Sequence, residues 1–518
     1  MSSISRREFV TAAAAATVAT GLEGVGQPKA ARKQPNVLYV FGDQHRAQSL
    51  PGQPFCPVIA PNFERFRREN FSMDTCISNY PLCTPYRAIL MSGRYPQQTG
   101  IMHLDMLLSM NEGALGETFQ KAGYATGYVG KWHLGGPGEN QHIIPAGPDR
   151  LGFEDWQAWA GTNQHYHAWT FDQKTGEKIS PEGWQPIPMT DEAIGFLKRQ
   201  SKEKPWFLVV SYNPPHPPYN PPEQELEQYP MNSLEFRPNV HTETPGPDTT
   251  GTAQFLESDD DIHKAMQGYY GAITGVDEQF GRLLKALDEN GQDEDTIVIY
   301  TSDHGDMMGS HGRIGKQVPF EESVRVPFLV KYPGMMRKGG SSDALFSAVD
   351  IYPTLCGLAG IPVPGHCSGR DLSGVIRGRS VHEQEMVFLL NQVVGEEEGL
   401  AEPEAEARSA EPAGHPGRRG RAVQRREGEG EGGTLKFVNM PSYRGVRTRT
   451  HTYAVTLTGR WLLYDNVADP YQLKNLVHDP AQISLMEKLD AAILAWMKST
   501  GDTFPYVENT KRYSSFPS

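Results

Sequence analysis

A cysteine, a proline and an arginine at fixed spacing stand out near the start of the chain. Cys83, Pro85 and Arg87 lie in the stretch LCTPYR at 82–87, which the apolar run at 88–91 follows. Proline suits a first helical turn, because its missing N–H would find no partner there. A helix beginning here would hold Cys83 at the positive end of its dipole and return Arg87 to the same face one turn later. The pattern predicts a reactive group in an anion-binding site.

A second motif, GYATGYVGKWHL, follows at 123–134. Cys-x-Pro-x-Arg and this motif together resemble the two signatures of the type I sulfatases of the alkaline phosphatase superfamily. In that family a formylglycine-generating enzyme oxidises the cysteine to Cα-formylglycine. The resemblance implies that such an enzyme also acts on this protein and oxidises Cys83. The chain departs from the family at Tyr86, where a small residue is usual.

Two polar pairs directly follow predicted buried strands, Asp43-Gln44 and Asp303-His304. Such pairs alone are more typical of turns, but in open parallel sheets ligands bind beyond the carboxyl ends of the strands. These mostly oxygen donors suit a hard divalent cation such as Ca²⁺, whereas the imidazole of His304 leaves Mn²⁺ open, and Mg²⁺ stays open as well. The resemblance adds Cys83, as formylglycine, to this metal site. The family has a second aspartate in place of Gln44.

The resemblance also implies catalytic roles. Formylglycine hydrates to a gem-diol, and one hydroxyl, activated by the metal, attacks sulfur in line. Removal of the other hydroxyl's proton then expels sulfate from the sulfated hemiacetal. Arg87 and Lys131 would steady the formylglycine, and His133 would take that proton. His216 and Lys316 would grip the sulfate and protonate the leaving alkoxide, a step worth roughly 10²–10⁴-fold in rate.

Other polar and aromatic residues are left with two interpretations. Aromatic residues of the segment 134–185 could form a wall for a sugar ring or could serve as core and loop anchors. Histidines outside the motifs are interpreted as surface residues without a catalytic role, although some could contact substrate. These residues are Trp156, Trp159, Tyr166 and Trp169, with His103, His165, His167 and His311.

The elements that must position these residues alternate between strand and helix. Continuous apolar runs predict buried parallel strands, and apolar positions at helical spacing predict the helices between them, with Thr190 as a helix N-cap. The alternation predicts an α/β, alkaline-phosphatase-like fold with a mainly parallel sheet and helices on both faces. The predicted strands are 35–41, 124–129, 206–211, 296–300 and 326–331, and the helices are 61–70, 83–91, 115–122, 191–199, 261–290 and 348–359, with loops over 134–185.

The pattern changes after about residue 380, which divides a catalytic domain at 35–380 from a smaller subdomain at 381–518. Strands and a final amphipathic helix predict a small antiparallel sheet with one helix. The stretch from Gly395 to Gly433 is rich in Glu, Gly, Arg, Ala and Pro, which predicts a disordered insertion. The predicted strands are 386–394, 435–440, 444–457 and 461–464, and the helix is 483–498; the stretch 463–476 resembles the C-terminal module of sulfatases.

The first 34 residues contain Arg6-Arg7 before an alanine-rich, weakly apolar stretch. That stretch is too short to span a bilayer, which needs about 20 apolar residues. It resembles a twin-arginine export signal, which implies the twin-arginine machinery as a partner and a periplasmic or extracellular location; a basic disordered tail is the other interpretation. No other segment has the pattern of a membrane span.

Net charge and cysteine content exclude some classes of protein. The 518 residues carry a formal net charge of −13, which argues against a nucleic-acid-binding protein. The five cysteines are few and odd in number, which argues against a disulfide framework, although a bond between Cys356 and Cys367 stays open.

From the motifs and the resemblance we expect a sulfatase acting on sulfate esters of a carbohydrate. A phosphonate monoester or phosphodiester hydrolase of the same superfamily is the enzymatic alternative. A pseudoenzyme that binds sulfated glycans is less compatible with a full set of acid, base and nucleophile.

Overall fold

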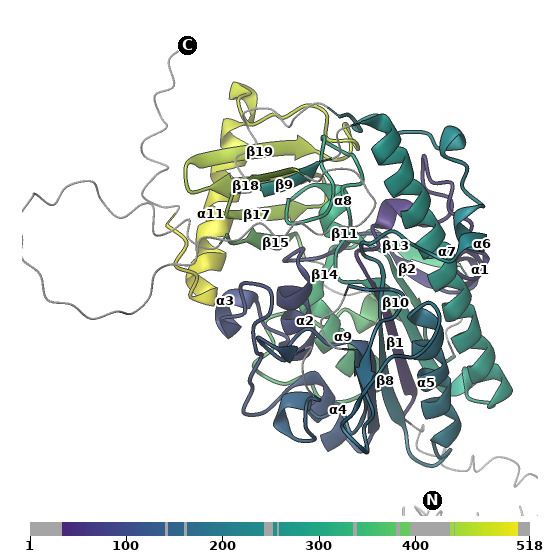
Figure 1. Ribbon diagram of the computed structural model, residues 1–518. Helices are drawn as coiled ribbons and strands as arrows, with labels where there is room; N and C mark the ends of the chain where they lie inside the picture. Colours follow the sequence, from purple (N-terminus) through teal and green to yellow (C-terminus); the bar gives the residue numbers. More distant parts are fainter. Residues whose placement is uncertain are drawn as a thin grey trace, which may run out of the picture. The chain divides into compact units, whose positions relative to one another are not determined.

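One mainly parallel sheet organises the computed structural model (Figure 1). In spatial order its eight strands are β13 (Gly340–Ser342), β2 (Phe71–Met73), β12 (Phe328–Lys331), β10 (Thr296–Ser302), β1 (Asn36–Asp43), β8 (Trp206–Pro215), β4 (Ala125–Lys131) and β5 (Asp155–Trp159). Only β12 runs antiparallel to its neighbours within this sheet. The predicted fold class is confirmed.

The structure describes the chain from residue 34 to residue 505, with gaps. The described ranges are 34–139, 143–159, 163–242, 252–255, 258–334, 339–379, 384–393, 436–439 and 441–505. The predicted export signal and the predicted insertion at 395–433 lie outside these residues.

The central strand β1 shows why the sheet is covered on both sides. All of its residues are buried, and side chains alternate between the two faces of a strand. Val37, Tyr39 and Phe41 pack in one core with α2, α4 and α9, whereas Leu38 and Val40 pack in a second core with α1, α5 and α7. The helices are α1 (Pro61–Glu69), α2 (Cys83–Ser92), α3 (Pro96–Thr99), α4 (Leu115–Lys121), α5 (Pro186–Arg199), α6 (Glu223–Leu226), α7 (Asp259–Glu289), α8 (Glu321–Val324), α9 (Ala348–Ala359), α10 (Ser373–Ile376) and α11 (Ile483–Thr500).

The C-terminal part forms the predicted small antiparallel sheet, with α11 against β17. Its strands are β15 (Met386–Asn391), β17 (Tyr443–Thr448), β18 (His451–Thr456) and β19 (Gly459–Asp465). The strand predicted at 435–440 exists as β16 (Lys436–Asn439), but it does not join this sheet. It pairs instead with β9 (Thr252–Phe255), which the sequence did not predict. Strand propensity identified the segment and carried no information about its partner.

The remaining short strands lie in two small sheets. One is formed by β11 (Arg325–Val326), β3 (Cys76–Ile77) and β14 (Phe346–Ser347), and the other by β6 (Thr170–Phe171) and β7 (Lys178–Ile179). The predicted strand 326–331 is thus divided at Pro327 between β11 and β12. The segment 134–185 is not purely loop either, because β5 extends the central sheet beside β4.

The structure corrects one further sequence prediction and decides one alternative that was left open. Thr190 does not cap a helix, because α5 begins at Pro186, and the Thr190 hydroxyl donates to the Pro186 carbonyl at 2.7 Å. Proline at the start of α5 needs no partner for an N–H, so the helix begins earlier than predicted. Cys356 and Cys367 are both free thiols.

The described residues from Pro35 onward form one compact unit, and the domain boundary near residue 380 stays a prediction. Among the described residues, every helix is too short or too polar to cross a membrane.

Candidate active site

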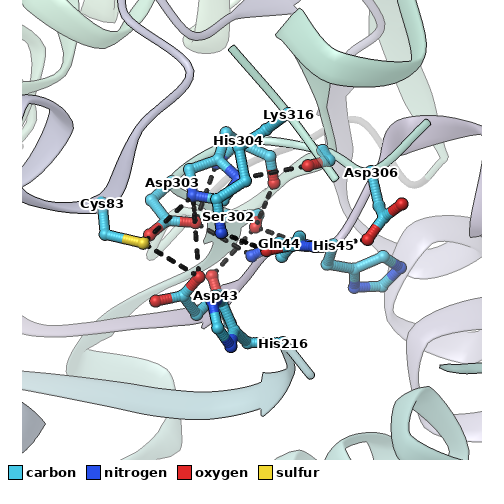
Figure 2. Close-up of polar contacts among 12 residues, drawn as sticks. Asp43, Gln44, His45, Cys83, His216, Ser302, Asp303, His304, Asp306 and Lys316 are labelled. Carbon is cyan, nitrogen blue, oxygen red and sulfur yellow. Dashed lines mark hydrogen bonds and ion pairs between the residues drawn. The ribbon is translucent and has the colours of Figure 1, made fainter. Parts of the chain in front are cut away.

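Four adjacent parallel strands of the central sheet deliver the predicted polar residues to one edge. Because the carboxyl ends of parallel strands lie on the same side, residues that end or follow these strands converge there. Figure 2 shows several of them around Cys83. The full converging set is Asp303 and His304 after β10, Asp43 at the end of β1 with Gln44 after it, His216 after β8, and Lys131 at the end of β4 with His133 two residues on.

Cys83 is the first residue of α2 and is almost fully buried. Its Sγ lies 3.5 Å from Asp43 Oδ1, 3.3 Å from His304 Nε2 and 3.9 Å from Lys131 Nζ. Burial and the Asp43 carboxylate would raise the pKa of the thiol, but Lys131, Lys316 and His304 together hold it well below its usual value. The positive surroundings predicted for this residue are present.

Arg87 lies one turn further along α2 and joins three strands to the site. Its Nη2 is 3.2 Å from Asp43 Oδ2, and its Nη1 donates to Ser211 Oγ at 2.8 Å and to the Lys131 carbonyl at 2.6 Å. Lys131 Nζ in turn is 2.7 Å from Asp43 Oδ2. Gly130 permits this arrangement, because a Cβ there would lie 2.1 Å from the Ser211 carbonyl oxygen. Arg87 and Lys131 are thus held rigidly against the same carboxylate.

Four donor groups are suitably placed for a metal ion. Ligand atoms of Asp43, Cys83, Asp303 and His304 all lie within 4.8 Å of one another, and all four residues are buried. Burial and the neighbouring Asp43 carboxylate raise the pKa of Asp303 to about 6, and within the described residues its Oδ2 accepts no hydrogen bond. Two buried carboxylates with an unfilled acceptor are the surroundings that a hard divalent cation stabilises. The donor set therefore fits the predicted metal.

Gln44 is oriented differently from a simple ligand. Its Oε1 accepts a hydrogen bond from Lys316 Nζ, and its Nε2 donates to Asp306. Asp306 also accepts from the Tyr219 hydroxyl at 2.7 Å. The sequence analysis missed Asp306, although it lies three residues after Asp303 in the same post-strand loop. The ligand role of Gln44 stays a prediction, since both ends of its amide already have partners.

His133 follows β4 with a backbone φ of +60°, an uncommon conformation for a residue with a side chain. Its Nε2 lies 2.9 Å from Asp105 Oδ1. Burial would lower the pKa of the imidazole, but Asp105 and Cys83 raise it above its usual value. The sequence analysis missed Asp105, because no motif links it to His133. The pair places a carboxylate-oriented imidazole beside the thiol.

His216 lies just beyond β8, as predicted. Its Nδ1 donates to the Pro217 carbonyl at 2.6 Å, which leaves Nε2 for another partner. Burial and the nearby Lys316 ammonium hold the pKa of His216 well below its usual value. These surroundings disfavour the protonated imidazole before an anion binds beside it.

Of the residues that the sequence left with two interpretations, Trp156, Trp159 and His165 are buried, and His167 is exposed. The others are partly buried: His103, Tyr166, Trp169 and His311. Trp156 stacks on Tyr128 at 5.4 Å, and Trp159 is 2% exposed, so both are core residues. Tyr86 is also buried, with its hydroxyl 3.3 Å from that of Tyr39; the large residue therefore fills the core. His165, expected at the surface, is fully buried, and burial lowers its pKa to about 3.

Comparisons with known proteins agree with this geometry. The family model described as Sulfatase matches residues 35–361. The chain is 33% identical to the ulvan-active sulfatase of Formosa agariphila over 478 residues, which cover 91% of this chain and 82% of that protein. It is 30% identical to the endo-4-O-sulfatase of Bacteroides thetaiotaomicron over 516 residues, with coverage of 88% and 91%.

A solved structure from Bacteroides thetaiotaomicron, reported with the metabolism of multiple glycosaminoglycans, superposes with a TM-score of 0.74. It has 27% sequence identity, and the match covers 93% of this chain and 99% of that one. The family model and the relatives span both the cysteine motif and the strand ends described above. This protein is therefore a member of the sulfatase family of the alkaline phosphatase superfamily, a sulfuric ester hydrolase.

Proposed function

We propose that this protein removes sulfate from a sulfated carbohydrate, using Cys83 after its oxidation to formylglycine and a Ca²⁺ ion held by Asp43, Asp303 and His304. The observation that carries the proposal is the position of the Cys83 thiol, which contacts a metal-donor residue on either side and a lysine ammonium. The names of the two relatives, which specify ulvan and an endo-acting 4-O-sulfatase, support a carbohydrate substrate.

The donor chemistry favours calcium. Two carboxylates are hard oxygen donors, and residue 83 would add a further oxygen after the thiol has been converted. Mn²⁺ and Mg²⁺ remain alternatives, because His304 contributes an imidazole. When bound, the cation would lower the pKa of a hydroxyl group at residue 83. Gln44 completes the set as a neutral donor if its amide exchanges the Lys316 contact for the ion.

Formylglycine supplies, as its hydrate, one hydroxyl for attack on sulfur and a second whose deprotonation releases sulfate. Arg87 and Lys131 hold the negative charge around residue 83, and their shared contact with Asp43 keeps both side chains in place. His133 accepts the proton in the second step. A base beside the nucleophile that is oriented by a third group is a recurring arrangement in covalent catalysis.

His216 and Lys316 bind the sulfate group and assist the leaving alkoxide. Lys316 reaches the site from a loop after β10, where Gln44 now accepts its hydrogen bond. Burial and Lys316 lower the pKa of His216 in the free protein and so disfavour its protonated imidazole. A bound sulfate anion opposes that effect, so substrate binding would itself favour the protonated imidazole that donates to the alkoxide.

Maturation and location follow from the same proposal. Cys83 is buried in the folded protein, so a formylglycine-generating enzyme would act before folding is complete. Export through the twin-arginine machinery, which carries folded proteins, is compatible with that order and would place the enzyme in the periplasm or outside the cell. Residues 35–380 would form the catalytic domain and 381–518 the smaller subdomain.

A substrate panel tests the proposal. Protein produced with a formylglycine-generating enzyme would be assayed on sulfated mono- and oligosaccharides, aryl sulfates, phosphonate monoesters and phosphodiesters, with Cys83→Ala as the control. We expect the highest kcat/KM on a sulfated sugar. Higher kcat/KM on a phosphonate or phosphodiester would favour the alternative hydrolase. Binding of sulfated glycans without any hydrolysis, in protein shown by mass spectrometry to contain formylglycine, would indicate a binding protein.

A further inference from the structure

The loop that carries Asp105 is joined to the loop that carries His133. An isolated antiparallel bridge pairs Leu107 with Gly135, and the Leu108 N–H donates to the Leu134 carbonyl at 3.1 Å. Residues two or three positions from Asp105 are thereby fixed to residues one or two positions from His133. The contact between the two side chains is supported by backbone pairing and is not a chance meeting of two surface groups.

A second device fixes the His133 backbone itself. The Glu139 carboxylate accepts hydrogen bonds from the His133 N–H at 2.8 Å and from the Gly135 N–H at 2.7 Å. His133 and Asp105 also both have a left-handed backbone, with φ of +60° and +57°. Such conformations cost energy and persist only where the surroundings enforce them, most often at functional sites.

The hydrogen bond between the side chains determines which ring nitrogen of His133 carries the proton. An ionised carboxylate only accepts hydrogen bonds, so Asp105 Oδ1, at 2.9 Å, requires a hydrogen on Nε2. In the neutral imidazole the lone pair is then on Nδ1. That nitrogen is buried without a hydrogen bond of good geometry among the described residues, and the neighbouring Cys83 side chain raises the pKa of the imidazole together with Asp105. A buried acceptor in that position is costly unless a ligand or a reacting group at residue 83 uses it.

We propose that Asp105 is a positioning residue that holds neutral His133 as the Nε2–H tautomer, so that Nδ1 is the base that releases sulfate. This inference rests on the proposed function. In that step the O–H bond of the remaining hydroxyl at residue 83 breaks and its proton bonds to Nδ1. The O–H electron pair forms the aldehyde C=O, and the C–O bond to the leaving sulfate breaks. Asp105 stabilises the resulting imidazolium through its charged hydrogen bond.

Asp105 acts only through His133, which makes Asp105→Asn the informative variant. An amide can accept from Nε2–H or donate to an unprotonated Nε2, so it no longer selects one tautomer. The variant can therefore still form one hydrogen bond between residue 105 and His133. The fold should be unaffected, because the Asp105 side chain is 72% exposed. Since general-base catalysis is worth roughly 10²–10⁴-fold, we expect kcat to fall by about 10- to 100-fold.

The direct test is NMR of protein labelled with ¹⁵N at histidine, at a pH where His133 is neutral. His133→Gln assigns the signal by its loss. We expect wild type to have hydrogen on Nε2 alone and Asp105→Asn to show a mixture of tautomers. Hydrogen on Nδ1 in wild type, or the same single tautomer in both proteins, would overturn the inference. This readout needs no turnover, so it decides the role of Asp105 even if the wild type were to lack sulfatase activity, which would contradict only the proposed function.

Kinetics test the step that is affected. With a sugar sulfate, Asp105→Asn should release one equivalent of alcohol per active site in an unchanged burst and then turn over slowly, because only the second half-reaction needs Nδ1. Asp105→Glu should recover part of kcat. Glu112→Gln removes an exposed carboxylate, 84% exposed, outside the site and should behave as wild type. Equal slowing of burst and turnover in Asp105→Asn, or no slowing of either, would overturn the assignment.

Discussion

Two buried groups of charged side chains in this protein differ in how their charges are balanced. The site cluster consists of Asp43, Asp303, His304 and Cys83 with Arg87 and Lys131. The junction cluster lies where α8 meets the C-terminal sheet and the segment before β9. It consists of Glu321 and Glu322 with Arg237, Arg325 and Arg447.

In the junction cluster each carboxylate faces arginine. Glu321 is 2.7 Å from Arg447 and 3.1 Å from Arg325, and Glu322 is 3.1 Å from Arg237. Burial would raise the pKa of both glutamates, but Arg447 and Arg237 respectively hold those pKa values below the usual range. The negative charge of each glutamate is therefore balanced by arginine within the protein.

In the site cluster the balance is incomplete. Lys131 and Arg87 both lie closest to Asp43, and Arg87 is also 3.5 Å from Asp303 Oδ2. Burial and the Asp43 charge nevertheless raise the pKa of Asp303 to about 6. The difference teaches that buried ion pairs alone do not mark a functional site. A carboxylate whose pKa is raised by burial and by a second carboxylate indicates one where further donor groups lie within reach of the same ion, as Cys83 and His304 do here.

The largest expected effect is the loss of turnover without loss of stability when Cys83 in the site cluster is replaced. Cys83→Ala removes the nucleophile, so turnover of sulfate esters should fall at least about 10⁴-fold while the melting temperature stays near that of wild type. Cys56→Ala, at a partly exposed free cysteine outside the site, is the control. An active preparation whose residue 83 is entirely unmodified cysteine by mass spectrometry would refute the mechanism.

Glu321→Gln should break the junction cluster. It leaves Arg447 and Arg325 buried or half-buried without their carboxylate, which is expected to cost about 3–5 kcal/mol of unfolding free energy. Chemical denaturation measures this cost, and Ca²⁺ affinity of the folded variant should match wild type. Glu289→Gln, which removes an exposed partner of Lys285, should change stability little. A stable Glu321→Gln variant with impaired metal binding would reverse the roles assigned to the clusters.

Asp303→Asn in the site cluster should weaken Ca²⁺ binding and leave the stability of the metal-free protein unchanged, the reverse of the effects expected for Glu321→Gln. Removal of a charged ligand is expected to weaken Ca²⁺ binding at least about 100-fold, since changes in the outer shell alone cost 10–100-fold. Stability measured in chelator should not fall, because the amide oxygen can still accept from the Gln44 and His304 N–H groups while a charge that burial disfavours is removed. Calorimetric titration and thermal unfolding with EDTA provide the two values. Tight Ca²⁺ binding by the variant would exclude Asp303 as a ligand.

His216→Ala should affect substrates according to their leaving groups. Sugar alkoxides need a proton and phenolates do not, so kcat/KM on a sugar sulfate should fall about 10- to 100-fold more than kcat/KM on an aryl sulfate. The ratio of the two losses is the measured quantity. Equal losses on both substrates would indicate that His216 only binds sulfate.

The smallest expected effect is on the pH dependence of stability without metal. Asp303 has a folded pKa near 6, above its usual value of 3.8, so the folded state binds its proton more tightly and stability should decline as pH rises from about 4 to 6. Glu321, with a lowered pKa, contributes stability above about pH 4.5 that is lost as the pH falls below it. Denaturation in chelator should show a flatter profile between pH 4 and 6 for Asp303→Asn. An unchanged profile would mean that Asp303 does not titrate there.

Local sequence determined a large part of this protein. The start of α2 at Cys83, the buried strands β1, β8 and β10, and the long helix α7 all follow from patterns within a few residues: proline placement, apolar runs and helical periodicity. Because these strands are parallel, the residues at their ends had to meet at one edge of the sheet. The meeting of Asp43, Asp303 and His304 could therefore be predicted from the sequence, whereas the place of Cys83 beside them was implied by the resemblance to sulfatases.

Tertiary structure decided the contacts that no local pattern encodes. Asp105 and His133 are 28 residues apart and meet only because two loops pair beside the site. The Gln44 amide is oriented by Lys316, 272 residues away, and β16 pairs with β9 and not with the neighbouring C-terminal sheet. Periodicity and turn chemistry act over one or two turns of chain, whereas partner choice depends on which surfaces the folded cores leave facing each other.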